Sequence, residues 1–175
     1  MKRNMTSTST APTSTTLAIP SFRKPALALL LGAVIFPAMA GDRCKDVRAD
    51  LDEIQSTTGC NPGLTSCFLG EVQGGHGFRG VTHFAADSAV STSPATSPNM
   101  LIYSGPFEYR TRRGTIVARE TGVTTRGSEG VVTAYQEIVS GTGEYAGATG
   151  YFFVSGHKTG GTVDTFVNGE ICTAH

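Results

Sequence analysis

The sequence predicts an all-β fold, an antiparallel β-barrel of about eight strands with a short N-terminal helical segment. After Cys67, segments rich in β-branched and aromatic residues recur at short intervals and are bounded by glycine or proline, as in strands joined by turns. No helical periodicity interrupts them, which favours an antiparallel sandwich or barrel. Four glycines within residues 141–150 indicate a tight corner between two strands, because glycine permits positive φ and close backbone approach. This corner favours the barrel.

Residues 1–40 have the features of a secretory signal peptide in the usual order. They contain basic residues but no acidic ones, and an apolar run over 26–36 leads into Ala38-Met39-Ala40, a cleavage site of the small-x-small type. The apolar run is too short to span a bilayer. We therefore expect a mature chain that starts at Gly41, has no stable membrane span and is secreted or periplasmic. The alternative is an uncleaved N-terminal anchor.

Charge argues against a nucleic-acid partner. The first 40 residues hold four of the 14 basic residues and none of the 14 acidic ones, so the rest of the chain has a net charge of −4. Binding to phosphate backbones needs clustered Lys and Arg. The one basic cluster, at Arg110, Arg112 and Arg113, is interpreted as a solvated hairpin end.

All four cysteines lie after the leader, and an even count in an exported chain predicts two disulfides. Three pairings are compatible with four cysteines. We favour Cys60–Cys67, which closes the turn at 61–63, and Cys44–Cys172, which ties the N-terminal segment to the last strand. A zinc site is the alternative, although the Cys-x-x-Cys spacing typical of such sites is absent from the sequence.

Residues 41–66 are predicted to form an N-terminal segment with a short amphipathic helix and the disulfide-closed turn. The helix is expected within 42–55, because Val47, Leu51 and Ile54 lie at helical spacing among charged residues.

The β-barrel domain is predicted over residues 67–175. Seven strands are expected, and the second is long enough to bend or split into two, which gives about eight. An eight-stranded barrel has room inside for packed side chains or for one small ligand. Residues 91–99, which contain two prolines, are expected to form a lid at one mouth. The predicted strands are 67–73, 78–89, 100–109, 115–124, 131–139, 148–155 and 162–173.

The glycine corner also carries a resemblance to a known family. Gly-Thr-Gly-x-aromatic-x-x-Ala-x-Gly over 141–150, followed by the strand at 151–156, resembles the corner shared by plant dirigent proteins, allene oxide cyclases and their bacterial barrel-like relatives. The resemblance covers roughly residues 67–172. Thr149 stands where plant dirigent proteins have an arginine associated with their site, so that residue is not carried over. The resemblance implies a homotrimeric barrel that cyclises a small molecule without a cofactor.

The sequence leaves open which face of the 131–139 strand lines the lumen. One face carries Tyr135 and Glu137, and the other carries Val132 and Ile138. If the more polar face points inward, Tyr135 and Glu137 are lumen residues. The aliphatic face is then covered by the N-terminal segment or by a partner subunit.

Ionisable groups within strands are the candidates for chemistry, because Gly-x-Ser-x-Gly, His-Glu-x-x-His and Walker motifs are absent from the sequence. His83 lies mid-strand among apolar neighbours, and a histidine pKa near neutrality suits proton transfer. His83 and Glu137 are the predicted catalytic residues; Tyr135, Tyr103 and Arg119 are the predicted substrate-binding residues. The alternative is a structural histidine for His83 and solvated positions for the rest. The four histidines lack the spacing of metal ligands, so no metal is expected.

Aromatic residues on several strands favour a lumen that binds a hydrophobic or phenolic small molecule. Two functions fit such a barrel. The first is a cofactor-free cyclase or isomerase, as the resemblance implies, in which a shaped cavity orients a reactive molecule and one ionisable group assists. The second is a non-catalytic, lipocalin-like secreted protein with a binding or structural role.

Overall fold

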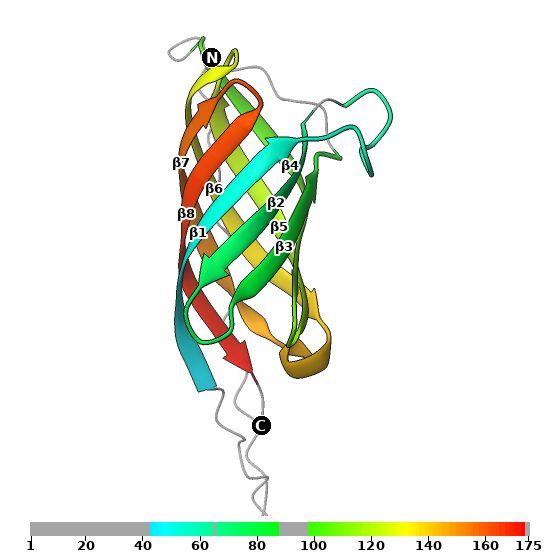
Figure 1. Cartoon of the computed structure of the whole chain (residues 1–175), viewed down its shortest axis with the longest axis vertical. Helices are drawn as coiled ribbons and strands as arrows, with labels where there is room; N and C mark the ends of the chain where they lie inside the picture. Colours follow the sequence, from blue (N-terminus) through cyan, green and yellow to red (C-terminus); the bar gives the residue numbers. More distant parts are fainter. Residues whose placement is uncertain (1–42, 65, 88–97, 174–175) are drawn as a thin grey trace, which may run out of the picture. The chain divides into compact units, whose positions relative to one another are not determined.

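The computed structural model describes residues 43–64, 66–87 and 98–173, and these residues form a closed barrel of eight antiparallel strands in sequence order (Figure 1). The ring closes where the last strand pairs with the first. The predicted all-β antiparallel barrel is therefore confirmed. The predicted leader, and the predicted lid except for residues 98 and 99, lie outside the described residues. The strands are β1 (Arg43–Gln55), β2 (Cys67–Gly74), β3 (Arg79–Ala85), β4 (Met100–Thr111), β5 (Gly114–Thr125), β6 (Glu129–Gly141), β7 (Thr149–Thr159) and β8 (Thr162–Thr173).

The eighth strand is β1, in the segment where a helix was expected. Val47, Ala49, Leu51 and Glu53 are buried, while the residues between them are exposed, which is the period of two of a strand with one face toward a core. Ile54 would belong to the apolar stripe of a helix, but it is 60% exposed. The helix prediction is therefore wrong for residues 43–55. The barrel domain accordingly begins at β1 and not at residue 67, and β3 is a single short strand that does not split.

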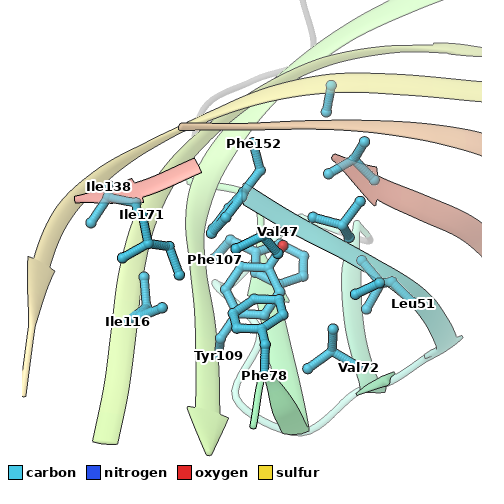
Figure 2. Close-up of a cluster of buried hydrophobic side chains, with 14 of the residues drawn as sticks. Val47, Leu51, Val72, Phe78, Phe107, Tyr109, Ile116, Ile138, Phe152 and Ile171 are labelled. Atoms are coloured by element: carbon cyan, nitrogen blue, oxygen red, sulfur yellow. The ribbon is translucent and has the colours of Figure 1, made fainter. Parts of the chain in front are cut away.

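A cluster of aromatic side chains packs inside the barrel. Figure 2 shows Phe78, Phe107, Tyr109 and Phe152 packed together, surrounded by aliphatic side chains such as Leu51. The ring centroids of Phe107 and Tyr109 lie 4.7 Å apart and those of Phe78 and Tyr109 lie 5.1 Å apart, in the tilted arrangements that aromatic pairs prefer. This part of the barrel is a packed core.

Contacts between turns tie together the end of the barrel next to this core. The Arg113 side chain, in the β4–β5 turn, donates to the backbone oxygen of His76 at 2.6 Å and pairs with Glu144 in the 3-10 turn η1 (Gly143–Tyr145). Gly143 has φ of 61°, and a Cβ there would lie 2.4 Å from the Arg113 backbone oxygen. A glycine is therefore required at this point of the corner.

Both predicted disulfides are present. Cys44 and Cys172 are register partners on β1 and β8, so their bond joins the first and last strands. Cys60 and Cys67 close the loop that follows β1. Among the described residues, no helix has the length and apolar character needed to cross a membrane.

Candidate functional site

A cavity of about 60 Å³, partly open to solvent, adjoins the aromatic core, and Phe84 belongs to both. It lies where β1, β3, β5 and β7 end and their neighbours begin. A volume of this size is enough for several water molecules. The cavity has apolar walls and a few polar groups, which is the usual composition of a small-molecule site. Its lining residues are Glu53, Ser66, Phe68, Phe84, Tyr103, Glu120, Thr124, Val132, Val154, Lys158, Val163 and Thr165.

Glu120 is the most deeply placed charged group of the cavity. It lies on the inner face of β5, alternating with Ala118, and is 5% exposed. Its carboxylate accepts hydrogen bonds from Gln136 Nε2 and from Tyr103. Gln136 Oε1 in turn accepts a hydrogen bond from the Tyr109 hydroxyl at 2.6 Å. A chain of hydrogen bonds thus connects the cavity to the packed core.

Glu53, on β1, is a second inward carboxyl that lines the same cavity, and it is 8% exposed. Within the described residues its Oε1 has no hydrogen-bond partner, and the same holds for the hydroxyl of Thr82, which is 2% exposed. The Glu53 and Thr82 side chains lie on either side of Gly70, because a Cβ built on this glycine would lie 2.7 Å from Glu53 Cγ and 2.8 Å from Thr82 Oγ1. Buried polar atoms without partners are rare and call for a functional explanation.

Burial separates the protonation behaviour of the two carboxyls. Burial raises the pKa of Glu120 to about 7, although the hydrogen bonds from Gln136 and Tyr103 favour its ionised form. Burial also raises the pKa of Glu53 well above its usual range, and the negative charge of Glu120 raises it further. Glu120 therefore titrates near neutral pH. Glu53 keeps its proton, because it has no such hydrogen bonds to favour its ionised form.

Two inward-facing glycines make room for the functional side chains. A Cβ on Gly122 would lie 2.3 Å from the Tyr103 hydroxyl oxygen, so the phenol occupies the space that a larger residue would fill. Gly70 provides the same space beside Glu53. In both strands, the glycine leaves space in the lumen for a polar group from a neighbouring strand.

Lys158 lies at the rim of the cavity, on β7. Its Nζ donates to the backbone oxygens of Thr125 at 2.5 Å and Gly127 at 2.6 Å, which leaves one of its three N–H groups for another acceptor. Burial lowers the pKa of this amine. Lys158 is the one cationic side chain among the lining residues.

Of the sequence-predicted site residues, only Tyr103 lines this cavity. Tyr135 is 42% exposed on the outer face of β6, and Glu137 is exposed on the same face. The inward set is Ala134, Gln136 and Ile138, which is the more apolar alternative. The interpretation that the polar face of this strand points inward is therefore wrong, because hydrophobic burial decides the orientation and Gln136 finds hydrogen-bond partners inside.

His83 and Arg119 also lie on the outer face, on different strands. The His83 Nε2 atom is 3.9 Å from the sulfur of Cys67, and a Cβ on Gly59 would lie 2.9 Å from its ring, so the 56–64 loop is packed against it. Arg119 pairs with Asp87 through both terminal nitrogens, one at 2.9 Å. Arg119 is the register partner of Glu137 on the outer face of the barrel, but neither His83 nor Arg119 lines the lumen cavity.

The residues that sequence reasoning missed are Glu53, Glu120 and Gln136. Glu120 is one of the ionisable groups within predicted strands, and the alternation of Ile116, Ala118 and Glu120 places it on the apolar face. That alternation is the signal that identifies it. Glu53 shows the same signal, which the helical interpretation of its segment obscured.

No family model matches the chain, and neither curated proteins nor solved structures show a similar protein.

Proposed function

We propose that this protein is an exported barrel that binds a small hydrophobic or phenolic molecule in its lumen and guides its isomerisation or cyclisation without a cofactor. The observation that carries the proposal is Glu120, a buried carboxyl that faces an apolar cavity and has a pKa of about 7. A group with this pKa exchanges protons efficiently near neutral pH, which is the requirement for general acid–base catalysis.

The lining defines the ligand that suits the cavity. Phe68, Phe84 and Val154 offer apolar surface to a compact ring or short chain, which a cavity of about 60 Å³ encloses in part and which extends through its opening to solvent. Glu53 offers a carboxyl oxygen without a partner, so a ligand with a hydroxyl or carbonyl group gains a hydrogen bond there. Two carboxyls facing the lumen disfavour an anionic ligand.

Export is supported by the two disulfides, which form and persist in oxidising compartments, together with the leader expected from the sequence. The resemblance of the glycine corner to allene oxide cyclases and dirigent proteins supports a cofactor-free reaction and a homotrimer. Val132 lines the cavity and Ile138 is buried in the core, so a subunit interface would use an outer face instead. The exposed rings of Tyr135 and Phe153 on β6 and β7 offer such a face.

A non-catalytic, lipocalin-like carrier would use the same cavity. Glu120 favours the catalyst, because a carrier of apolar molecules has no need for a buried group that titrates near neutrality. Burial of the Glu120 carboxyl lowers the stability of the fold, because hydrogen bonds do not fully compensate for the lost hydration of a buried charge.

Binding is tested by titrating the protein with phenol, which is neutral at pH 7, and following methyl and aromatic NMR signals. Wild type should show saturable shifts at Val154 and Phe84, which line the cavity. The change Val132→Phe places a ring in the cavity and should abolish these shifts. The matched control is Val131→Phe, the same change one residue earlier on the exposed face of β6, which should bind as wild type does.

Two results would contradict lumen binding. The first is an absence of saturable shifts in wild type. The second is equal binding by the Val132→Phe and Val131→Phe variants, provided that both melt near the wild-type temperature.

A further inference from the structure

The different surroundings of Glu53 and Glu120 assign each a role. Resting on the proposed function, we infer that the lumen catalyses proton transfer at a carbon next to a carbonyl group, with Glu120 as the base and Glu53 as the hydrogen-bond donor to the carbonyl oxygen. Both carboxyls line the same cavity, from strands on different parts of the barrel.

Hydrogen bonding makes Glu120 the base. Gln136 and Tyr103 both donate to its carboxylate, and donors to the charged form stabilise that form. The Gln136 amide is held in this orientation by the Tyr109 hydroxyl, which donates to its oxygen at 2.6 Å. These hydrogen bonds offset part of the effect of burial, so the anion of Glu120 forms near neutral pH.

The lack of hydrogen bonding makes Glu53 the acid. Its Oε1 has no partner among the described residues, so nothing there stabilises an anion, and the adjacent Thr82 hydroxyl is also unpaired. A neutral carboxyl has a proton to donate, and Glu53 is one of the residues that line the cavity. A carboxyl kept neutral by its surroundings is a strong hydrogen-bond donor to developing negative charge.

The other titratable groups around the cavity agree with these roles. Burial raises the pKa of Tyr103 and of Tyr109, so both phenols stay neutral donors while Glu120 titrates. Lys158, at the rim, is held by two backbone carbonyls. The structure describes no cation paired with either carboxyl of the lumen.

The step balances without an oxidant or a metal. Glu120 takes a proton from the carbon next to the carbonyl; the C–H electrons form a carbon–carbon double bond, and the carbonyl π electrons move onto oxygen, which accepts the hydrogen bond from Glu53. Glu120 then returns the proton to the far carbon of the adjacent double bond. The net result moves that double bond into conjugation with the carbonyl.

The substrate class is therefore a small, neutral, apolar ketone or aldehyde with an unconjugated double bond. Cyclohex-3-enone is a suitable probe, because it is a single ring and its conversion to cyclohex-2-enone raises the ultraviolet absorbance. The rate with wild type should rise as pH increases through about 7, since the base must be ionised.

Four variants separate the roles. Glu120→Gln should lower the rate by about 10²-fold or more, the contribution typical of a general base. Glu53→Leu should lower it by about 10²-fold through loss of the donor, whereas Glu53→Gln keeps an N–H donor and should retain more activity. Gln136→Leu, which removes a donor to the anion, should move the midpoint of the pH profile upward. The control is Glu137→Gln, the same change at an exposed carboxyl, which should leave the rate unchanged.

The outcomes distinguish the two proposals. Saturable binding of phenol without isomerisation of cyclohex-3-enone, or a Glu120→Gln variant as fast as wild type, overturns the assigned roles and leaves lumen binding intact. Absence of both binding and isomerisation overturns the proposed function as well. Thermal melts of each variant establish that a lost rate is not lost folding.

Discussion

Raising the pH from 5 to 8 should lower the free energy of unfolding of this protein, because folding buries Glu120 with its carboxyl protonated. Its folded-state pKa of about 7 lies above the ordinary value of 4.5. Between these values the unfolded chain has released the proton that the folded state still holds. Stability is therefore greatest below pH 4.5 on account of this group, and it falls as pH rises through about 7.

The size of the effect follows from the same two values. A difference of one bound proton changes the free energy of unfolding by about 1.4 kcal/mol per pH unit. Across the window from 4.5 to about 7, Glu120 accounts for a loss of about 3 kcal/mol. The raised pKa of Glu53 acts in the same direction. Asp87, whose pKa is lowered by the hydrogen bond and charge of Arg119, titrates below this window.

Urea unfolding followed by circular dichroism at pH 5, 6, 7 and 8 measures this dependence. Glu120→Gln, which keeps the shape without the charge, should remove much of it and should be more stable than wild type at pH 8. Glu137→Gln, on the exposed face, should keep the wild-type dependence. A free energy of unfolding that is flat or rises between pH 5 and 7 would refute the buried-acid interpretation.

Four further predictions concern the scaffold. Gly143→Val should lower the free energy of unfolding in urea by more than about 2 kcal/mol, because the side chain would clash with backbone and the positive φ would be strained. Gly147→Val, where φ is 70° and the surrounding space is open, should lower it by about 1–2 kcal/mol. Equal losses for the two variants would contradict this. Replacing Cys44 and Cys172 with serine should lower stability by about 4 kcal/mol, more than loss of the short-loop disulfide, in the same unfolding assay. N-terminal sequencing of exported protein should begin at Gly41; an intact leader would contradict processing. Light scattering should give the mass of a trimer, and a stable monomer would remove that part of the family resemblance.

The strand pattern could be predicted because its signals are local. Turn glycines and alternating residues determine β2 to β8 within a few positions each. β1 could not be distinguished in the same way, because Val47 and Leu51 are four residues apart, and residues at that spacing share a face in both a helix and a strand. Ala49 and Glu53, which are buried, and Ile54, which is exposed, separate the two periods.

The site was less accessible to sequence reasoning because its contacts are distant along the chain. Gln136 lies on the inner face because Tyr109, 27 residues away, and Glu120, 16 residues away, satisfy its amide. Without those partners a glutamine on a strand is interpreted as an exposed residue. The space for Tyr103 likewise depends on Gly122, a residue of the next strand. Neighbour relations of this kind exist only in the folded barrel.

The pairing of the first strand with the last sets when this barrel can form. β1 and β8 are neighbours, and residues 128 positions apart are joined across them, so the hydrogen-bonded ring stays open until the final residues of the chain are available. Contacts with such large sequence separation make folding slow. Glu53 is on β1 and Glu120 is on β5, so the two carboxyls of the lumen face one enclosed cavity only once the ring has closed. A chain shortened before β8 therefore lacks the site as well as the strand.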